Sequence, residues 1–292
     1  MRAGKSICRF SVPYLFLLPQ IILVGTFSLY PFIYNLILSF QEYRFSGNQF
    51  IGLSNYTELF ADPVFRQTVI NTLVYSLGTV PLTIFVALFT AMALNQKIKG
   101  RAFFRTAFLL PYLVSWVVIG IIWQWMYSID YGVFNQLLNF IGIPSVRWLQ
   151  DPKLTIPSIV VASVWHDVGY YMVIILAGLQ SISPSYYEAA GIDGANAWQQ
   201  FKSITLPLLK PILFIVVVLS VIHSFKVFDQ IFVMTAGGPG RASLMMVNYI
   251  ISLTTEEMRL GYASALSMVL FVVIFILTIV QRVIFKDKDV EG

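Results

Sequence analysis

The sequence contains few charges and almost no cysteine. Only 11% of its 292 residues are charged, against about 25% in soluble proteins, while 58% are hydrophobic and the mean hydropathy is +0.77. This composition excludes an ordinary soluble domain and indicates an integral membrane protein. The one cysteine, Cys8, can form neither an internal disulfide nor a metal site, so it gives no information about the redox compartment.

Common catalytic and nucleotide-binding motifs are also missing. Neither His-Glu-x-x-His nor Gly-x-Ser-x-Gly occurs, which argues against an intramembrane metalloprotease or serine hydrolase. Gly4-Lys5-Ser6 matches the end of a phosphate-binding loop, but the sequence supplies neither the glycine required five residues earlier nor a preceding strand. We therefore expect a non-catalytic chain that binds no cofactor or metal, with any ATP bound by another subunit.

Long apolar runs are the main feature that is present. A helix needs about 20 apolar residues to cross a bilayer. Six runs meet this requirement, at approximately 13–39, 69–94, 104–127, 155–180, 208–230 and 263–284. The connecting segments are too short to fold separately, so we predict one all-α transmembrane domain over residues 1–292. Arg2, Lys5 and Arg9 resemble the start of a signal peptide, but the following run is too long and has no cleavage site, so we expect it to remain as a span.

The distribution of positive charge predicts the topology. With both termini in the cytoplasm, twelve of the nineteen Lys and Arg residues fall inside, six fall outside and Lys226 lies within a span. This excess favours cytoplasmic termini, because cytoplasmic loops carry more Lys and Arg. Three connections then face outward, at about 40–68, 128–154 and 231–262, and two face inward, at 95–103 and 181–207.

The longer inward connection predicts a structured element. Ser183 can cap a helix that starts at Pro184, and Gly194 can end it in a left-handed conformation. Residues 195–203 can form a second helix, which Pro207 should stop before the fifth span. This helix-turn-helix could dock onto a cytoplasmic partner or lie on the membrane surface as an amphipathic hairpin.

The spacing within this loop favours docking. Glu188-Ala189-Ala190 is followed after three residues by Gly194, and nine residues later by Ile204-x-Leu206-Pro207. The pattern resembles the EAA motif of the membrane subunits of binding-protein-dependent ABC importers at every fixed position and in both gaps. The resemblance implies that ATPase coupling is carried by Glu188, Ala189, Ala190, Asp193, Gly194, Ile204, Leu206 and Pro207.

The resemblance covers nearly the whole chain and is strongest to the carbohydrate-uptake branch, of the type of the first maltose permease subunit. Matching stretches lie at 50–56, 97–101, 225–229, 237–239 and 261–265. The additional N-terminal spans and large outer domain of the maltose subunit have no counterpart here. The resemblance implies a six-helix type I importer permease in a bacterial inner membrane, paired with a second homologous permease. It further implies two ATPase subunits that bind ATP and Mg, an extracytoplasmic solute-binding protein and a sugar or oligosaccharide solute, with no nucleic acid.

Ionisable residues within the apolar runs are candidates for the solute path. An unpaired charge at mid-bilayer costs about 2.5–3.5 kcal/mol on insertion scales, so each needs a polar environment. His223, Lys226 and Asp229 are three apart and would share one side of the fifth span, either lining a pore or with Lys226 and Asp229 as a structural pair. His166-Asp167 could line the same cavity or mark a kink. Lys226 and His223 could also favour an acidic sugar.

Aromatic residues add further candidates. Stacking on sugar rings is one interpretation of Trp116, Trp123, Trp125, Tyr127, Tyr170 and Tyr171, while belts at the membrane interface are the commoner role of Trp and Tyr. Tyr170 completes the predicted solute path with His166, Asp167, His223, Lys226 and Asp229. The alternative class is an ion-coupled secondary transporter of a polar solute, although such proteins usually have symmetric halves, and none is visible in the sequence.

Overall fold

The computed structural model describes residues 16–44, 47–96 and 98–285. These residues are predominantly helical, as predicted, with one pair of two-residue strands. Contacts within the chain divide it into two units, residues 1–62 with 250–269 and residues 63–249 with 270–292. The predictions made for Cys8, for the terminal charges and for Gly4-Lys5-Ser6 fall outside the described residues.

The elements are as follows, in chain order. The smaller unit contains η1 (Gly25–Leu29), α2 (Tyr30–Leu38), β1 (Gln41–Glu42), β2 (Gln49–Phe50) and α3 (Ser54–Ala61). The larger unit contains α4 (Pro63–Asn95), α5 (Arg101–Leu113), α6 (Trp116–Met126), α7 (Val133–Phe140), α8 (Thr155–Ser181), α9 (Pro184–Ile192), α10 (Ala197–Gln200), η2 (Phe201–Thr205), α11 (Leu206–Phe225) and α12 (Asp229–Thr235). Both units share α13 (Met246–Thr255) and α14 (Leu260–Phe285).

Two stretches noted in the sequence, 50–56 and 261–265, meet in the smaller unit. The strands pair antiparallel, with Gln41 opposite Phe50. The side-chain amide of Asn55 donates to the carbonyl oxygens of Ser39 and Gln41, both at 3.0 Å. Gly261 packs against the Gln41 carbonyl, where a Cβ would collide with the oxygen. These contacts tie the end of α2, the hairpin and the start of α14 together.

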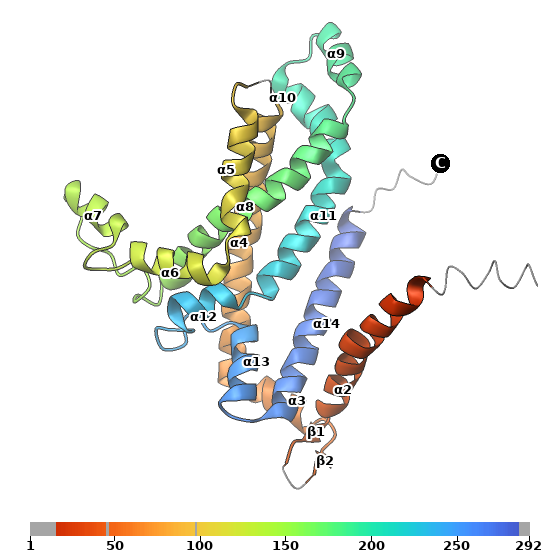
Figure 1. The fold of residues 1–292 in the computed structure, drawn as a ribbon, viewed down its shortest axis with the longest axis vertical. Helices are drawn as coiled ribbons and strands as arrows, with labels where there is room; N and C mark the ends of the chain where they lie inside the picture. The colour runs from red at the N-terminus through yellow and green to blue at the C-terminus, as the bar shows by residue number, and fades with distance from the viewer. Residues whose placement is uncertain (1–15, 45–46, 97, 286–292) are drawn as a thin grey trace, which may run out of the picture. The chain divides into compact units, whose positions relative to one another are not determined.

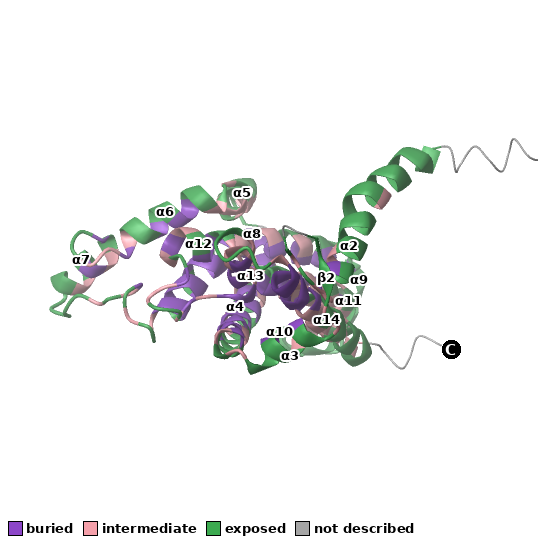
Figure 2. Cartoon of the chain, turned by 90° about the horizontal axis from the view of Figure 1, so that it is seen from below, coloured by how far each residue is buried: buried purple, intermediate pink, exposed green. Residues whose placement is uncertain are grey.

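Helix α8 is the centre of the larger unit. It contacts α4, α5, α11 and α12, and about two thirds of its most apolar stretch is buried. Figure 2 shows the buried residues concentrated on α8 and on the face of α4 that meets it. Gly169 allows α5 to approach closely, because a Cβ there would meet the backbone of Phe108, with the carbonyl carbon at 2.6 Å. The position of α5 therefore depends on this glycine.

Five helices are long and apolar enough to cross a membrane: Phe16–Leu38, Pro63–Asn95, Thr155–Ser181, Ala197–Phe225 and Leu260–Phe285. The third predicted run, 104–127, is not a single helix. It consists of α5 and α6, which bend by 96° at the break between them, and counting the pair as one span gives six. Pro111 removes a helical N–H near the end of α5, and Ser115 caps α6 by accepting from the Val117 amide, so the sequence itself favours the break.

The fifth predicted run differs from the structure at both ends. Helix α10 continues through the π-helix η2 into α11, so Pro207 does not stop the helix, contrary to the prediction. The Leu206 amide donates to the Phe201 carbonyl, five residues back, and this π-bulge shifts the bonding where proline lacks an N–H. At the other end, α11 stops at Phe225 and not at residue 230.

Candidate functional site

The first helix of the 181–207 loop forms as its capping residues predict. The Ser183 hydroxyl accepts from the Ser185 amide at 3.4 Å, and Pro184 occupies the first helical position of α9. The helix ends at Ile192, and Gly194 follows with φ of 77°. The Ala195 amide reaches back to the Ala190 carbonyl at 2.9 Å, so the left-handed glycine closes the helix end.

The second helix begins two residues later than predicted, at Ala197 and not Ala195. Asn196 is extended, and its side chain accepts from the Gln199 amide at 3.0 Å. The Gln199 side chain in turn accepts from the Asn196 amide at 2.8 Å, which completes a capping box. A strong cap at Asn196 therefore determines the start of α10.

The loop is tied to the helix that follows it. The Tyr187 hydroxyl lies 2.9 Å from the Thr205 hydroxyl, and the side-chain amide of Gln200 donates to the Ala195 carbonyl at 3.1 Å. Figure 1 shows α9 and α10 together at one end of the larger unit. Since Thr205 directly precedes α11, this contact links α9 to the start of that helix.

The surface of the loop suits a protein partner. Ile192 is 88% exposed, Trp198 is 68% exposed and Tyr186 is 55% exposed. Glu188 is also exposed and forms no ion pair with any other residue that the structure describes. The remaining motif residues Ile204, Leu206 and Pro207 lie away from this tip, in η2 and at the start of α11.

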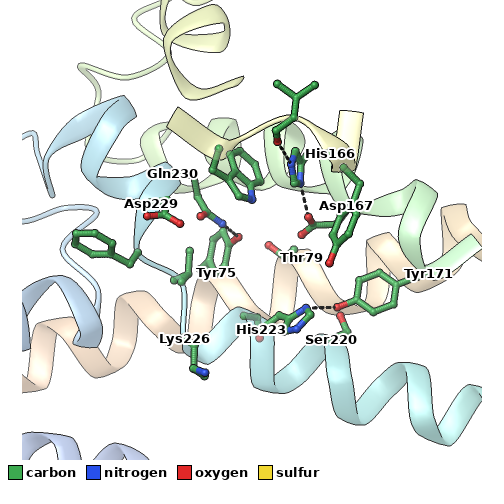
Figure 3. Close-up of a pocket in the computed structure, with 16 residues that line it drawn as sticks. Tyr75, Thr79, His166, Asp167, Tyr171, Ser220, His223, Lys226, Asp229 and Gln230 are labelled. Atoms are coloured by element: carbon green, nitrogen blue, oxygen red, sulfur yellow. Dashed lines mark hydrogen bonds and ion pairs between the residues drawn. The ribbon is translucent and has the colours of Figure 1, made fainter. Parts of the chain in front are cut away.

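A polar cavity of about 440 Å³ lies in the larger unit, enclosed by α4, the α5–α6 break, α8, α11 and the segment leading into α12. Figure 3 shows its polar side chains converging from these elements. Five of the six predicted solute-path residues line it: His166, Asp167, His223, Lys226 and Asp229. The sixth, Tyr170, is not among the lining residues and stacks on Tyr112 with the ring centroids 4.5 Å apart.

His166 and Asp167 connect α8 to the α5–α6 break. The His166 Nδ1 atom lies 2.6 Å from a carboxylate oxygen of Asp167, and Nε2 lies 3.3 Å from the Val114 carbonyl oxygen. The Trp116 ring lies against the imidazole with the centroids 4.1 Å apart. Both ring nitrogens face oxygens, so the imidazole is fixed in orientation. Helix α8 runs without a break through this point.

His223, Lys226 and Asp229 line the cavity without sharing one side of a helix, because the chain leaves α11 after Phe225. The His223 Nδ1 atom lies 3.0 Å from the Tyr171 hydroxyl. Lys226 and Asp229 form no ion pair in the described chain, and Figure 3 shows their charged ends directed apart. The described part of the chain therefore shows no structural pair of these two residues, and their role in the solute path stays a prediction.

Sequence reasoning missed the polar wall of the cavity. Gln230 donates to the Tyr75 hydroxyl at 3.0 Å, which donates to the Ser163 hydroxyl at 2.9 Å. Thr79 also lines the cavity and is a further neutral polar residue of this wall. Neutral polar residues within apolar runs of the sequence could have indicated this wall, but the prediction used only ionisable and aromatic residues.

The predicted aromatic candidates lie in different places. Trp116 and Tyr171 line the cavity, whereas Trp123 and Tyr127 are buried in the core and Trp125 is 55% exposed outside the cavity. Within the described ranges, no group of three or more His, Cys, Asp or Glu residues could hold a metal.

A bundle of membrane-spanning helices with a capped helical loop and an internal polar cavity defines a permease-like transport subunit. The chain belongs to the family of the binding-protein-dependent transport system inner membrane component, whose model matches residues 63–289. It is 37% identical to the probable ABC transporter permease protein YurN of Bacillus subtilis over 96% of this chain and 98% of that protein. It is also 37% identical to the arabinooligosaccharides transport system permease protein AraP of Halalkalibacterium halodurans, over 95% of this chain and 90% of that one.

The fold is shared with solved structures. A chain from the crystal structure of a bacterial alginate ABC transporter, in complex with an alginate pentasaccharide-bound periplasmic protein, superposes with a TM-score of 0.86. Sequence identity is 26%, and the match covers 97% of each chain. The predicted family and the type I permease fold are confirmed, and with them a multi-pass, non-catalytic transport subunit in place of an ion-coupled secondary transporter.

Proposed function

We propose that this chain forms half of the pore of an ATP-driven sugar importer and couples it to separate ATPase subunits through the 183–207 loop. The observation that carries the proposal is the exposed, doubly capped helix pair with Glu188 at its surface, joined to α11 through Tyr187 and Thr205. A second, homologous permease supplies the other half of the pore.

The loop acts as a rigid contact for the ATPases. ATP and Mg are bound by the ATPase pair, and closure of that pair displaces α9, whose apolar tip residues Ile192 and Trp198 provide contact area. The link from Tyr187 to Thr205 passes the displacement to α11, which carries His223 into the cavity wall. The bundle then alternates between inward-facing and outward-facing states.

The polar cavity holds the solute during transport. Its hydroxyl, amide and charged groups suit a polyhydroxylated molecule, and the Trp116 ring suits the apolar face of a sugar. AraP is named for arabinooligosaccharides, and the structural neighbour for alginate bound to a periplasmic protein. These names favour a carbohydrate that a solute-binding protein delivers from outside.

The proposal places Glu188 and both termini in the cytoplasm, and Asn55, Lys153 and Gly238 outside, in one permease domain. Single cysteines at these positions, with Cys8 replaced, can be tested with an impermeant thiol reagent in intact cells. Labelling at position 188 but not at position 55 would reverse the orientation.

The coupling role can be tested with Glu188→Lys. The purified complex in liposomes is assayed for ATPase activity with and without loaded binding protein, and for uptake of labelled sugar. Charge reversal should abolish stimulation and uptake while both permeases still assemble, and Glu188→Gln should retain more of each because it keeps the size of the side chain. Normal stimulation and uptake in Glu188→Lys would refute the docking assignment.

A further inference from the structure

A second cavity lies at the C-terminal end of α12, whose N-terminal end lines the first cavity. It has a volume of about 410 Å³, within the range of small-molecule sites. Its lining combines the C-terminal half of α12 with one residue of α6 and with the segment before α8, and includes Gln124, Gln150, Phe232 and Thr235. No residue lines both cavities.

Helix α12 joins the two cavities. Phe228, Asp229 and Gln230 line the first cavity, while Phe232 and the residues after it line the second. The rings of Phe228 and Phe232 stack at 23° with their centroids 5.4 Å apart, so one ring from the wall of each cavity takes part in the same pair. Seven helical residues span about 10 Å, which is longer than one sugar ring and within the length of a short oligosaccharide.

The chemistry of the second cavity suits a sugar unit. Phe232 is 59% exposed, so its ring is available to the apolar C–H face of a sugar. Gln150 is exposed and its side-chain amide bonds to nothing in the described part of the chain. Gln124 donates to the Met234 carbonyl at 3.4 Å, which leaves its side-chain oxygen able to accept from a hydroxyl.

The second cavity is also held in a defined shape. Helix α6 packs on α12 through Gly120, where a Cβ would meet a methyl group of Val233 at 2.9 Å. The Thr235 hydroxyl lies 2.8 Å from the Ser243 hydroxyl, which fixes the end of α12. The ring and the two amides are therefore presented by packed elements.

We propose that the second cavity is a further sugar subsite and that the solute is an oligosaccharide, which occupies both cavities at once by lying along the Phe228–Phe232 pair. This inference rests on the proposed function, because it assumes that the first cavity takes a sugar. A monosaccharide in the first cavity leaves the second subsite empty.

The test compares the uptake of oligosaccharides of different lengths. Labelled gluco-, arabino- and mannurono-oligosaccharides of one to five units are offered to the complete transporter with its binding protein in proteoliposomes, and initial uptake is measured. Wild type should take up members of three or more units, and Phe232→Ala with Gln150→Ala should lower that uptake roughly tenfold. Uptake of the monosaccharide, which leaves the second subsite empty, should change less than about twofold. Phe232→Tyr should retain transport, and Phe140→Ala, which truncates a 90% exposed ring outside both cavities, should match wild type.

Each result decides a separate point. Uptake limited to monosaccharides, unchanged uptake of the long members by the double variant, or an equal loss for short and long members would each overturn the second subsite. Uptake of none of the sugars by wild type, with ATPase activity intact, would count against the proposed function itself. If the double variant does not assemble, Gln150→Ala alone applies the same test, since that side chain has no partner to lose.

Discussion

The 183–207 loop and the polar cavity belong to the same unit but are held together in different ways. In the loop, the stabilising hydrogen bonds join near neighbours, such as Asn196 with Gln199, three residues apart. In the cavity they join distant parts of the chain, such as Tyr75 with Gln230, 155 residues apart. The loop therefore needs only its own sequence to form, whereas the cavity exists only when α4, α8, α11 and α12 are packed.

This difference matches the tasks proposed for the two regions. A contact that transmits force benefits from a shape that does not change as the bundle moves, and local caps provide it. A cavity that opens and closes benefits from walls carried by separate helices, because small helix shifts then change its access. Substitutions that act on packing should therefore damage the cavity, while those that act on backbone conformation should damage the loop.

The largest effect is expected at the packing contact between α5 and α8. Gly169→Ala places a methyl group against the Phe108 backbone, which cannot rotate away, so α5 must shift and the folded state should lose about 3 kcal/mol. Thermal unfolding of the purified complex measures the loss. Gly191→Ala is the matched control, because a Cβ there meets nothing within 4 Å and the position is helical, so stability should be unchanged or slightly higher. Equal stability of the two variants would show that α5 is not held by this contact.

The next effect is expected at the turn of the loop. Gly194→Val forces a β-branched residue to a φ of 77°, at a cost of about 1–3 kcal/mol, or roughly 5- to 150-fold in the docking equilibrium. Uptake by reconstituted complex should fall accordingly, while the thermal unfolding of the bundle stays as in wild type. Gly194→Asn should keep most of the uptake, because Asn tolerates the left-handed region. Unchanged uptake in Gly194→Val would separate the loop from coupling.

The same contrast explains how far the sequence could predict the structure. Ser183, Pro184 and Gly194 act on the backbone within one turn of themselves, so their roles follow from residue type. Asn196 was missed as the start of α10, although the Asn-x-x-Gln pattern of a capping box was present. The π-bulge that carries the helix past Pro207 was not predicted, because a proline within a helix usually ends or kinks it.

The cavity was predictable only as a set of candidate residues. Charged groups in apolar runs need a polar environment, and that rule identified five lining residues. It could not reveal that α11 ends at Phe225, or that Lys226 and Asp229 point apart. It also gave no reason to prefer Tyr171 over Tyr170, because adjacent residues on α8 differ in direction by the helical rotation alone. Long-range partners such as Tyr75 and Gln230 require the packed bundle.

An intermediate effect is expected from Lys226→Ala. Lys226 is exposed at the cavity and has no ion pair in the described structure, so its loss should act on the solute, not on stability. A lost hydrogen bond from a charged group costs about 1.5 kcal/mol, so uptake at limiting solute should fall roughly tenfold. Lys226→Ala/Asp229→Ala should not restore it. Full recovery of transport in the double variant would mean that the two residues do interact during the transport cycle and that the solute role of Lys226 is wrong.

The smallest effect is expected from the cap of α10, and it tests whether the loop is stabilised locally. Asn196→Ala removes both hydrogen bonds of the capping box and should cost about 1 kcal/mol, confined to the first turn of α10. Amide hydrogen exchange at Ala197–Gln200 should then be roughly fivefold faster, since exchange from native proteins follows local opening. Exchange in α8, which belongs to the packed bundle, should be unchanged, and Asn196→Asp should exchange like wild type because a carboxylate accepts the same bond. Faster exchange spread over α8 as well as α10 would show that the loop and the bundle open together, and the distinction between a locally built coupling element and a cooperatively built cavity would no longer hold.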